Sequence, residues 1–196
     1  MPALTTNKEY LEFLEKCENW ANSNSTEIYS NDGAPQANAV MSTIFKKSQE
    51  QIRIFANNVD GTISQCCECD DTFMKSLGEF ISRPNTNLKV VIQTKPDHPA
   101  KFFNFLVHKS KEENSRVELK IASSAFLNNI LSKRPPGEKS VRGNEYIHFA
   151  TGDSHMFRIE YDSVLHNAKF SFKNETFTKL LIDDFDSFLS SCEKVS

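Results

Sequence analysis

A short segment near residue 150 holds the side chains whose types and spacing could do chemistry. It is Asn144-Glu-Tyr-Ile-His-Phe-Ala-Thr-Gly-Asp153, which contains Tyr146, His148 and Asp153. A histidine can act as a nucleophile or transfer a proton. Because side chains alternate across a strand, Tyr146, His148 and Ala150 should share one face. The segment predicts either a hydrogen-bonded pair of His148 and Tyr146 beneath the surface or a pocket in which these side chains act on a ligand.

Positive side chains lie on both sides of this segment. Arg158 and Glu160 are two positions apart on one face of a predicted strand, so Arg158 could bind a phosphate bidentately or join a cross-strand ion pair. A breaker-rich loop before the segment carries four more cations: Lys133, Arg134, Lys139 and Arg142. This loop could contact a nucleic-acid backbone or an acidic partner, or it could be simply solvated.

Cysteine and histidine spacing predicts no metal site. Cys66-Cys67-Glu68-Cys69 lacks a second Cys/His pair at the spacing of tetrahedral zinc sites. His155 and His166 are expected to be solvated turn residues. The odd number of cysteines, five, and the lack of a signal peptide predict reduced thiols and a cytoplasmic location. No cofactor is expected.

The composition is that of an ordinary globular domain. The chain has 196 residues, of which 38% are hydrophobic and 25% charged, and its formal net charge is -3. This balance is not that of a dedicated nucleic-acid binder. No apolar run is long enough to span a membrane, so no membrane partner is expected.

Hydrophobic periodicity predicts alternating helices and strands, followed by clustered strands. The predicted helices cover residues 7–20, 37–49, 71–82, 102–107, 125–131 and 177–189. The predicted strands cover residues 27–29, 51–56, 87–93, 117–122, 146–150, 157–161 and 169–172. Trp20 should dock the first helix, and Asp186 should lie on the solvated face of the last. The alternation predicts a mostly parallel sheet covered on both faces, with an antiparallel end.

From about residue 37 to residue 192, the chain resembles one phospholipase D-like domain. The resemblance rests on the helices and strands of residues 37–93, on Asn167-Ala-Lys-Phe-Ser-Phe172 and on the closing helix. It implies a three-layer α/β/α sandwich with a mixed, mostly parallel sheet. Residues 35–196 would form this domain, and residues 1–34 would be an N-terminal helical extension.

The catalytic motif of that family is His-x-Lys-x-x-x-x-Asp. One histidine forms a phosphohistidine, a second histidine from the other half of a two-fold site protonates the leaving oxygen, and the lysine stabilises phosphoryl charge. Aligning Asp153 with the motif aspartate puts His148 at the lysine position and Tyr146 at the nucleophile position. The alternative register makes His148 the nucleophile, puts Ala150 at the lysine position and leaves Asp153 two residues early. Both registers leave the motif incomplete, so the resemblance implies at most an altered phosphate pocket at His148 and Tyr146. Only one such motif is present, so catalysis would also need a homodimer to supply the second half of the site.

The resemblance therefore implies one favoured use and two alternatives. The favoured use is a catalytically inactive domain that serves as an interaction or regulatory subunit, encoded in a bacterial operon. Its partner would be another protein or a second copy of the chain. The first alternative is a homodimeric, metal-independent phosphodiesterase or nuclease with an altered active site. The second is a nucleic-acid-binding accessory protein.

Overall fold

In the part of the chain that the structure describes, β-branched and aromatic residues form the centre of one eight-stranded sheet, and amphipathic helices cover it. The computed structural model describes residues 7–65, 70–131 and 147–195. The strands are β1 (Tyr29–Asn31), β2 (Gln51–Ala56), β3 (Asn87–Ile92), β4 (Val117–Ile121), β5 (His148–Gly152), β6 (Met156–Asp162), β7 (Asn167–Ser171) and β8 (Glu193–Lys194). The helices are α1 (Asn7–Asn22), α2 (Gly33–Lys47), α3 (Asp70–Ser82), α4 (Lys101–Ser110), α5 (Ser124–Leu131) and α6 (Glu175–Leu189).

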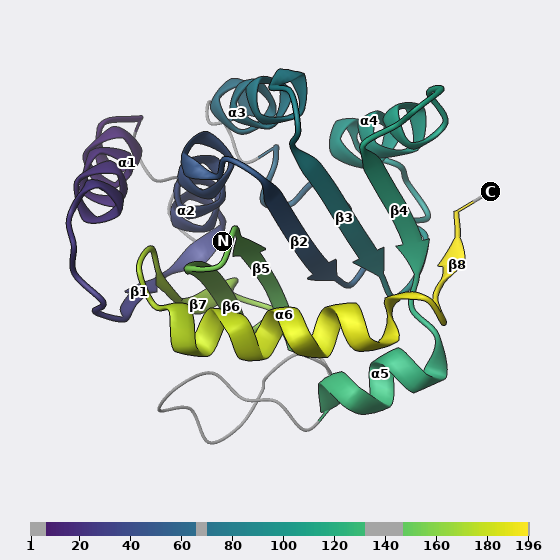
Figure 1. The fold of residues 1–196 in the computed structure, drawn as a ribbon. Coiled ribbons are helices and arrows are strands. Elements are labelled where there is room, and N and C mark those ends of the chain that lie inside the picture. The colour runs from purple at the N-terminus through teal and green to yellow at the C-terminus, as the bar shows by residue number, and fades with distance from the viewer. Residues whose placement is uncertain (1–6, 66–69, 132–146, 196) are drawn as a thin grey trace.

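The sheet joins a parallel part to an antiparallel part (Figure 1). Its strand order is β1-β7-β6-β5-β2-β3-β4-β8. β2, β3 and β4 pair in parallel through the crossover helices α3 and α4, as the alternation predicts. β5 runs antiparallel beside β2 and continues into β6, β7 and β1.

The predicted mixed three-layer sandwich is confirmed, but its parallel part is smaller than expected. Only the pairings β2–β3 and β3–β4 are parallel among the described strands. The short strands β1 and β8 extend the sheet at its two edges in antiparallel pairings. Neither edge pairing needs a crossover helix, so the alternation of helices and strands does not reveal them.

Two hydrophobic cores lie on opposite faces of the sheet. The larger core packs α1, α2, α3 and α4 against one face, with Ile52 and Ile54 of β2 among its residues. The smaller core packs α5 and α6 against the other face, where Phe55 of β2 and Phe185 of α6 are fully buried. The alternation along β2 therefore sets which side chains can face which helical layer.

The N-terminal helix is docked by aromatic packing. Trp20 stacks on Tyr29 at a centroid distance of 4.2 Å and lies 5.9 Å from Phe170 of β7. The Tyr10 hydroxyl donates a hydrogen bond of 3.1 Å to Asn38 of α2. The predicted extension thus contributes a helix to the larger core and the edge strand β1 to the sheet.

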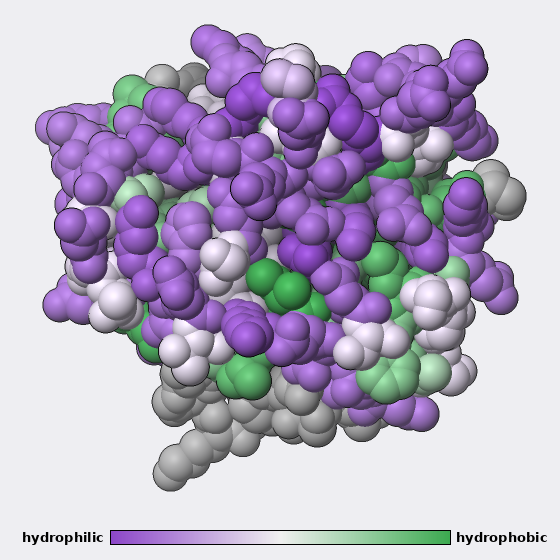
Figure 2. Space-filling model, in the orientation of Figure 1, coloured by the Kyte–Doolittle hydropathy of each residue, from purple (hydrophilic) through white to green (hydrophobic). Residues whose placement is uncertain are grey.

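The face seen in Figure 2 is mostly hydrophilic, with small and separate hydrophobic spots. Such a surface differs from the large contiguous apolar patches that mark broad hydrophobic interfaces. Across the described ranges, no helix combines the length and the apolar character that a membrane crossing needs.

Candidate functional site

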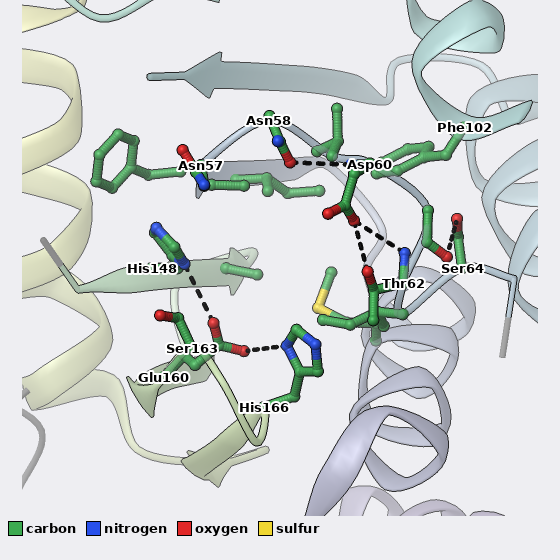
Figure 3. A pocket seen from close by; sticks show the side chains of 18 of the residues that line it. Asn57, Asn58, Asp60, Thr62, Ser64, Phe102, His148, Glu160, Ser163 and His166 are labelled. Atoms are coloured by element: carbon green, nitrogen blue, oxygen red, sulfur yellow. Dashed lines mark hydrogen bonds and ion pairs between the residues drawn. The ribbon is translucent and has the colours of Figure 1, made fainter. Parts of the chain in front are cut away.

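A pocket lies beyond the ends of two central strands of the sheet, where β2 ends and β5 begins (Figure 3). Its cavity volume is about 300 Å³. The end of β2 and the loop of residues 57–64 form one wall, and β5, β6 and the turn of residues 163–166 form another. Helices α2, α3 and α4 contribute Met41, Phe73 and Phe102. Ligands of α/β sheets commonly bind at the carboxyl ends of parallel strands, so this is the candidate site.

The loop that forms the first wall is shaped by Asp60 and Gly61. The Asp60 carboxylate accepts hydrogen bonds from the backbone N–H and the hydroxyl of Thr62, at 3.0 and 2.8 Å. Gly61 has a φ of 100°, and a Cβ at this position would lie 2.6 Å from the Cβ of Ala100. Glycine is therefore required both by the backbone conformation and by the close approach.

His148 is held at the pocket by partners on two other segments. It lies directly opposite Glu160 in the β5–β6 pairing, with Nδ1 3.1 Å from Oε1 of Glu160. Its Nε2 lies 3.0 Å from the side-chain amide of Gln93, just after β3. An ionised carboxylate can only accept, so Nδ1 donates to Glu160. The side-chain NH₂ group of Gln93 can only donate, so Nε2 of the neutral imidazole accepts from it. Both ring nitrogens are thus engaged within the protein.

Glu160 is an ionised carboxylate in a buried position. Its side chain is 4% exposed. Burial alone would raise the pKa of Glu160, but the Arg158 guanidinium, with His148 and His166 beside the carboxylate, outweighs that effect and holds the pKa far below its ordinary value. The carboxylate therefore stays charged at neutral pH.

Arg158 forms an ion pair within its own strand, not the cross-strand pair that the sequence offered as an alternative to phosphate binding. Its Nη2 donates to Oε2 of Glu160 at 3.0 Å and to the His166 carbonyl at 3.0 Å, while Nε donates to Asn31 at 3.1 Å. Arg158 is buried, at 4% exposure. The pair lies along one strand and not across two, because residues two apart on β6 point to the same face.

His166 packs closer to the site than a solvated turn residue would. It has a φ of 58°, and its carbonyl accepts from both Asn31 and Arg158. Its Nδ1 lies 3.5 Å from Oε2 of Glu160, so two imidazoles flank one carboxylate (Figure 3). Among the described residues, Gln93 and Asn31 also belong to this network, and the sequence had pointed to neither.

Asp153 lies at the opposite end of β5 from His148. Its carboxylate accepts hydrogen bonds from the backbone N–H groups of Gln49, Glu50 and Gln51, at 2.8, 2.9 and 3.0 Å. Five strand residues span about 16 Å. Asp153 therefore holds the connection between α2 and β2 and does not line the pocket.

Several predicted contact residues lie outside the described ranges. These are Tyr146, Lys133, Arg134, Lys139 and Arg142, together with the cluster Cys66, Cys67 and Cys69. Within the described ranges, no group of three or more potential ligands could hold a metal ion.

The pocket wall carries little net positive charge. Of the described residues that line it, Arg158 is the only arginine or lysine, and Glu160 already neutralises it. Asp60 adds a negative charge at the opposite wall. Ala150 also lines the pocket, and it takes the lysine position in the register that makes His148 the nucleophile.

Comparison with solved structures identifies the architecture. The chain is similar to NucT from Helicobacter pylori, with a TM-score of 0.55 and 9% identity over 86% of this chain and 100% of that one. It is similar to Nuc, a phospholipase D family member from Salmonella typhimurium, with a TM-score of 0.54 and 11% identity over 86% and 99%.

TrmBL2, an archaeal chromatin protein, matches with a TM-score of 0.53 and 16% identity over 96% of this chain. The present chain spans 62% of the length of that protein. No protein-family model and no curated protein matches the sequence. The matches to NucT and Nuc each cover 86% of this chain, and the chain has a phospholipase D-like fold.

Proposed function

We propose that this chain is a phospholipase D-like domain that cleaves no phosphodiester and serves as an interaction or regulatory subunit. The observation that carries the proposal is the closed network of Gln93, His148, Glu160 and Arg158. It engages both nitrogens of the histidine and the charge of the arginine inside the protein.

Phosphoryl transfer by a histidine needs a nitrogen lone pair directed at phosphorus and a cation for the phosphoryl oxygens. The lone pair on Nε2 of His148 accepts from Gln93, and Arg158 is paired with Glu160. A phosphate in this pocket would also face the carboxylates of Glu160 and Asp60. Among the described lining residues, the histidine lone pair and the arginine charge are both already engaged, and this supports the proposal.

The direct test is a cleavage assay without added metal. Purified protein in EDTA is incubated with duplex DNA, single-stranded DNA, RNA and a chromogenic phosphodiester. We expect no hydrolysis above buffer for the wild type or for His148→Ala. The control variant is His98→Ala, because His98 is exposed and is not among the residues that line the pocket. Cleavage that is lost in His148→Ala and kept in His98→Ala would refute the proposal.

The interaction role is tested by co-expression with the products of neighbouring genes and size-exclusion chromatography. A stable complex, or a concentration-dependent homodimer in sedimentation, is the expected result. His148→Ala should leave that complex intact, because the histidine is turned into the protein and not toward a partner. A chain that stays monomeric and alone under all these conditions would contradict the role.

Nucleic-acid binding is the second candidate, and the similarity to a DNA-binding chromatin protein favours it. Fluorescence anisotropy with labelled duplex DNA over a salt series measures it. A variant with serine at Lys133, Arg134, Lys139 and Arg142 should lose affinity and show a shallower salt dependence. The charge-matched control places serine at Lys8, Lys75, Lys111 and Lys179, which are exposed. Equal losses in both variants would exclude specific use of the loop.

A further inference from the structure

One part of the pocket lining is apolar and another part is acidic. The proposed interaction role does not require such a lining. The apolar part consists of side chains from β2, the following loop and three helices: Met41, Ile54, Val59, Ile63, Phe73 and Phe102. Phe73 and Phe102 are in edge-to-face contact at 5.1 Å. A volume of about 300 Å³ lies at the lower end of the range for small-molecule sites.

Two carboxylates face the cavity from opposite walls. Glu160 projects from β6 between the two histidines, and Asp60 projects from the loop (Figure 3). One oxygen of Asp60 is held by Thr62, and the other points into the cavity in Figure 3. With Arg158 as the single cation among the described lining residues, the fixed charges sum to about one negative charge.

This charge selects among ligand classes. A phosphate or carboxylate would be repelled by Asp60 and would find Arg158 already paired with Glu160. A positively charged nitrogen would be attracted to Asp60, while the pair of Glu160 and Arg158 adds no net charge. Glu160 retains acceptor capacity, because a carboxylate offers about four lone-pair sites. The aromatic wall adds a surface against which the apolar body of such a ligand can pack.

The geometry points to a binding site for a small organic amine, with its apolar body against Phe73 and Phe102 and its ammonium group between Glu160 and Asp60. A bound amine would connect the loop of residues 57–64 to the β5–β6 hairpin. Binding of a small molecule at this site could thus regulate the domain. The assignment stands or falls independently of whether the domain cleaves phosphodiesters.

Three probes with one common ring test the assignment: benzylamine, benzyl alcohol and phenyl phosphate. Each is titrated into the ¹⁵N-labelled protein, and amide shifts are followed by NMR. We expect benzylamine to shift residues 57–64 and the β5–β6 hairpin saturably, with at least about tenfold higher affinity than benzyl alcohol, a difference of about 1.4 kcal/mol. Phenyl phosphate should give no saturable shift. Tighter binding of phenyl phosphate, or no saturation by benzylamine, would overturn the assignment.

Matched variants locate the site. Val164 is 62% exposed and lines the pocket, whereas Leu165 is 48% exposed and does not. Val164→Trp should weaken benzylamine binding at least tenfold by filling the pocket mouth, and Leu165→Trp should not. Equal affinity in the two variants would contradict the placement.

Charge is tested separately at Asp60, where asparagine keeps a side-chain oxygen that can accept from Thr62 and so preserve the turn. Asp60→Asn should weaken benzylamine severalfold and leave benzyl alcohol unchanged, whereas Asp97→Asn, in an exposed loop, should change neither. An unchanged benzylamine affinity in Asp60→Asn would remove the electrostatic basis. The cleavage assay stays a separate readout, so failure of one proposal leaves the other intact.

Discussion

Replacing Asp153 separates a structural use of this residue from a catalytic one. Its carboxylate accepts three backbone N–H groups from the connection between α2 and β2, at distances of 2.8 to 3.0 Å. Asp153 also has a φ of 48°, in the left-handed region that aspartate and asparagine tolerate better than alanine. We therefore expect Asp153→Ala to destabilise the fold through two effects that Asp153→Asn largely avoids.

The magnitude follows from the exposure of the three donors. The amides of Gln49 and Glu50 are exposed, so water can replace the carboxylate there, while the bond to Gln51 is partly buried. Together the three bonds contribute about 2 kcal/mol once solvent screening is allowed for. Alanine at this φ adds about 1 kcal/mol of strain. The total of about 3 kcal/mol corresponds to a decrease in Tm of about 6–12 °C.

Urea unfolding followed by circular dichroism measures this difference. Asp153→Asn keeps one side-chain oxygen acceptor and a residue that tolerates this backbone conformation. The unfolding free energy should therefore fall by only about 1 kcal/mol. Ser154→Ala is the control, because Ser154 is the next residue and is exposed. A loss below about 0.5 kcal/mol in Asp153→Ala would refute the structural role, since a change of that size is typical of ordinary surface positions.

Three further predictions concern buried charges and thiols. Glu160→Gln should lower the unfolding free energy by about 3 kcal/mol at pH 7, because Arg158 stays buried without its ion pair. Since folding lowers the pKa of Glu160, the stabilisation by its carboxylate is present above about pH 4.3 and is lost as the pH falls below that value. Urea unfolding at pH 3 should therefore show a smaller difference between the variant and the wild type. Asp186→Ala should cost about 1–2 kcal/mol in the same assay, because it leaves Arg53 unpaired. Cys17 should resist iodoacetamide until the protein unfolds, as judged by mass spectrometry, because burial raises the pKa of its thiol.

The strands with side chains packed on both faces could be predicted almost to the residue. β2 was expected at residues 51–56 and lies at Gln51–Ala56, and β3 was expected at 87–93 and lies at Asn87–Ile92. Their β-branched and aromatic runs reflect burial under both helical layers. The edge strands show the limit of this signal. β8 consists of Glu193 and Lys194, which carry no hydrophobic pattern, and its pairing with β4 alone defines it.

The candidate site was predictable only where its partners are close in sequence. Arg158 and Glu160 are two residues apart on one strand, so their ion pair had a local signal. Gln93 lies 55 residues from His148, and Asn31 lies 127 residues from Arg158. These contacts follow from the order of strands in the sheet, which periodicity does not encode.

The last helix shows the same limit. Asp186 was expected on its solvated face, but it forms a 2.6 Å ion pair with Arg53 of β2, 133 residues away. Amphipathic periodicity separates apolar from polar positions. It does not show which polar position of a helix meets a buried cation on the sheet beneath it.

The motif residues His148 and Asp153 lie at opposite ends of β5 and make different kinds of contacts. At one end, Asp153 holds backbone amides that the fold needs whether or not any phosphate is bound. At the other end, about 16 Å away, His148 lies at a pocket whose cation and lone pair are engaged within the protein. An aspartate at this position is therefore evidence of the fold, not of phosphoryl transfer. Because the two ends are about 16 Å apart, substitutions at His148 and Asp153 should have additive effects on stability, which a double-mutant cycle can measure.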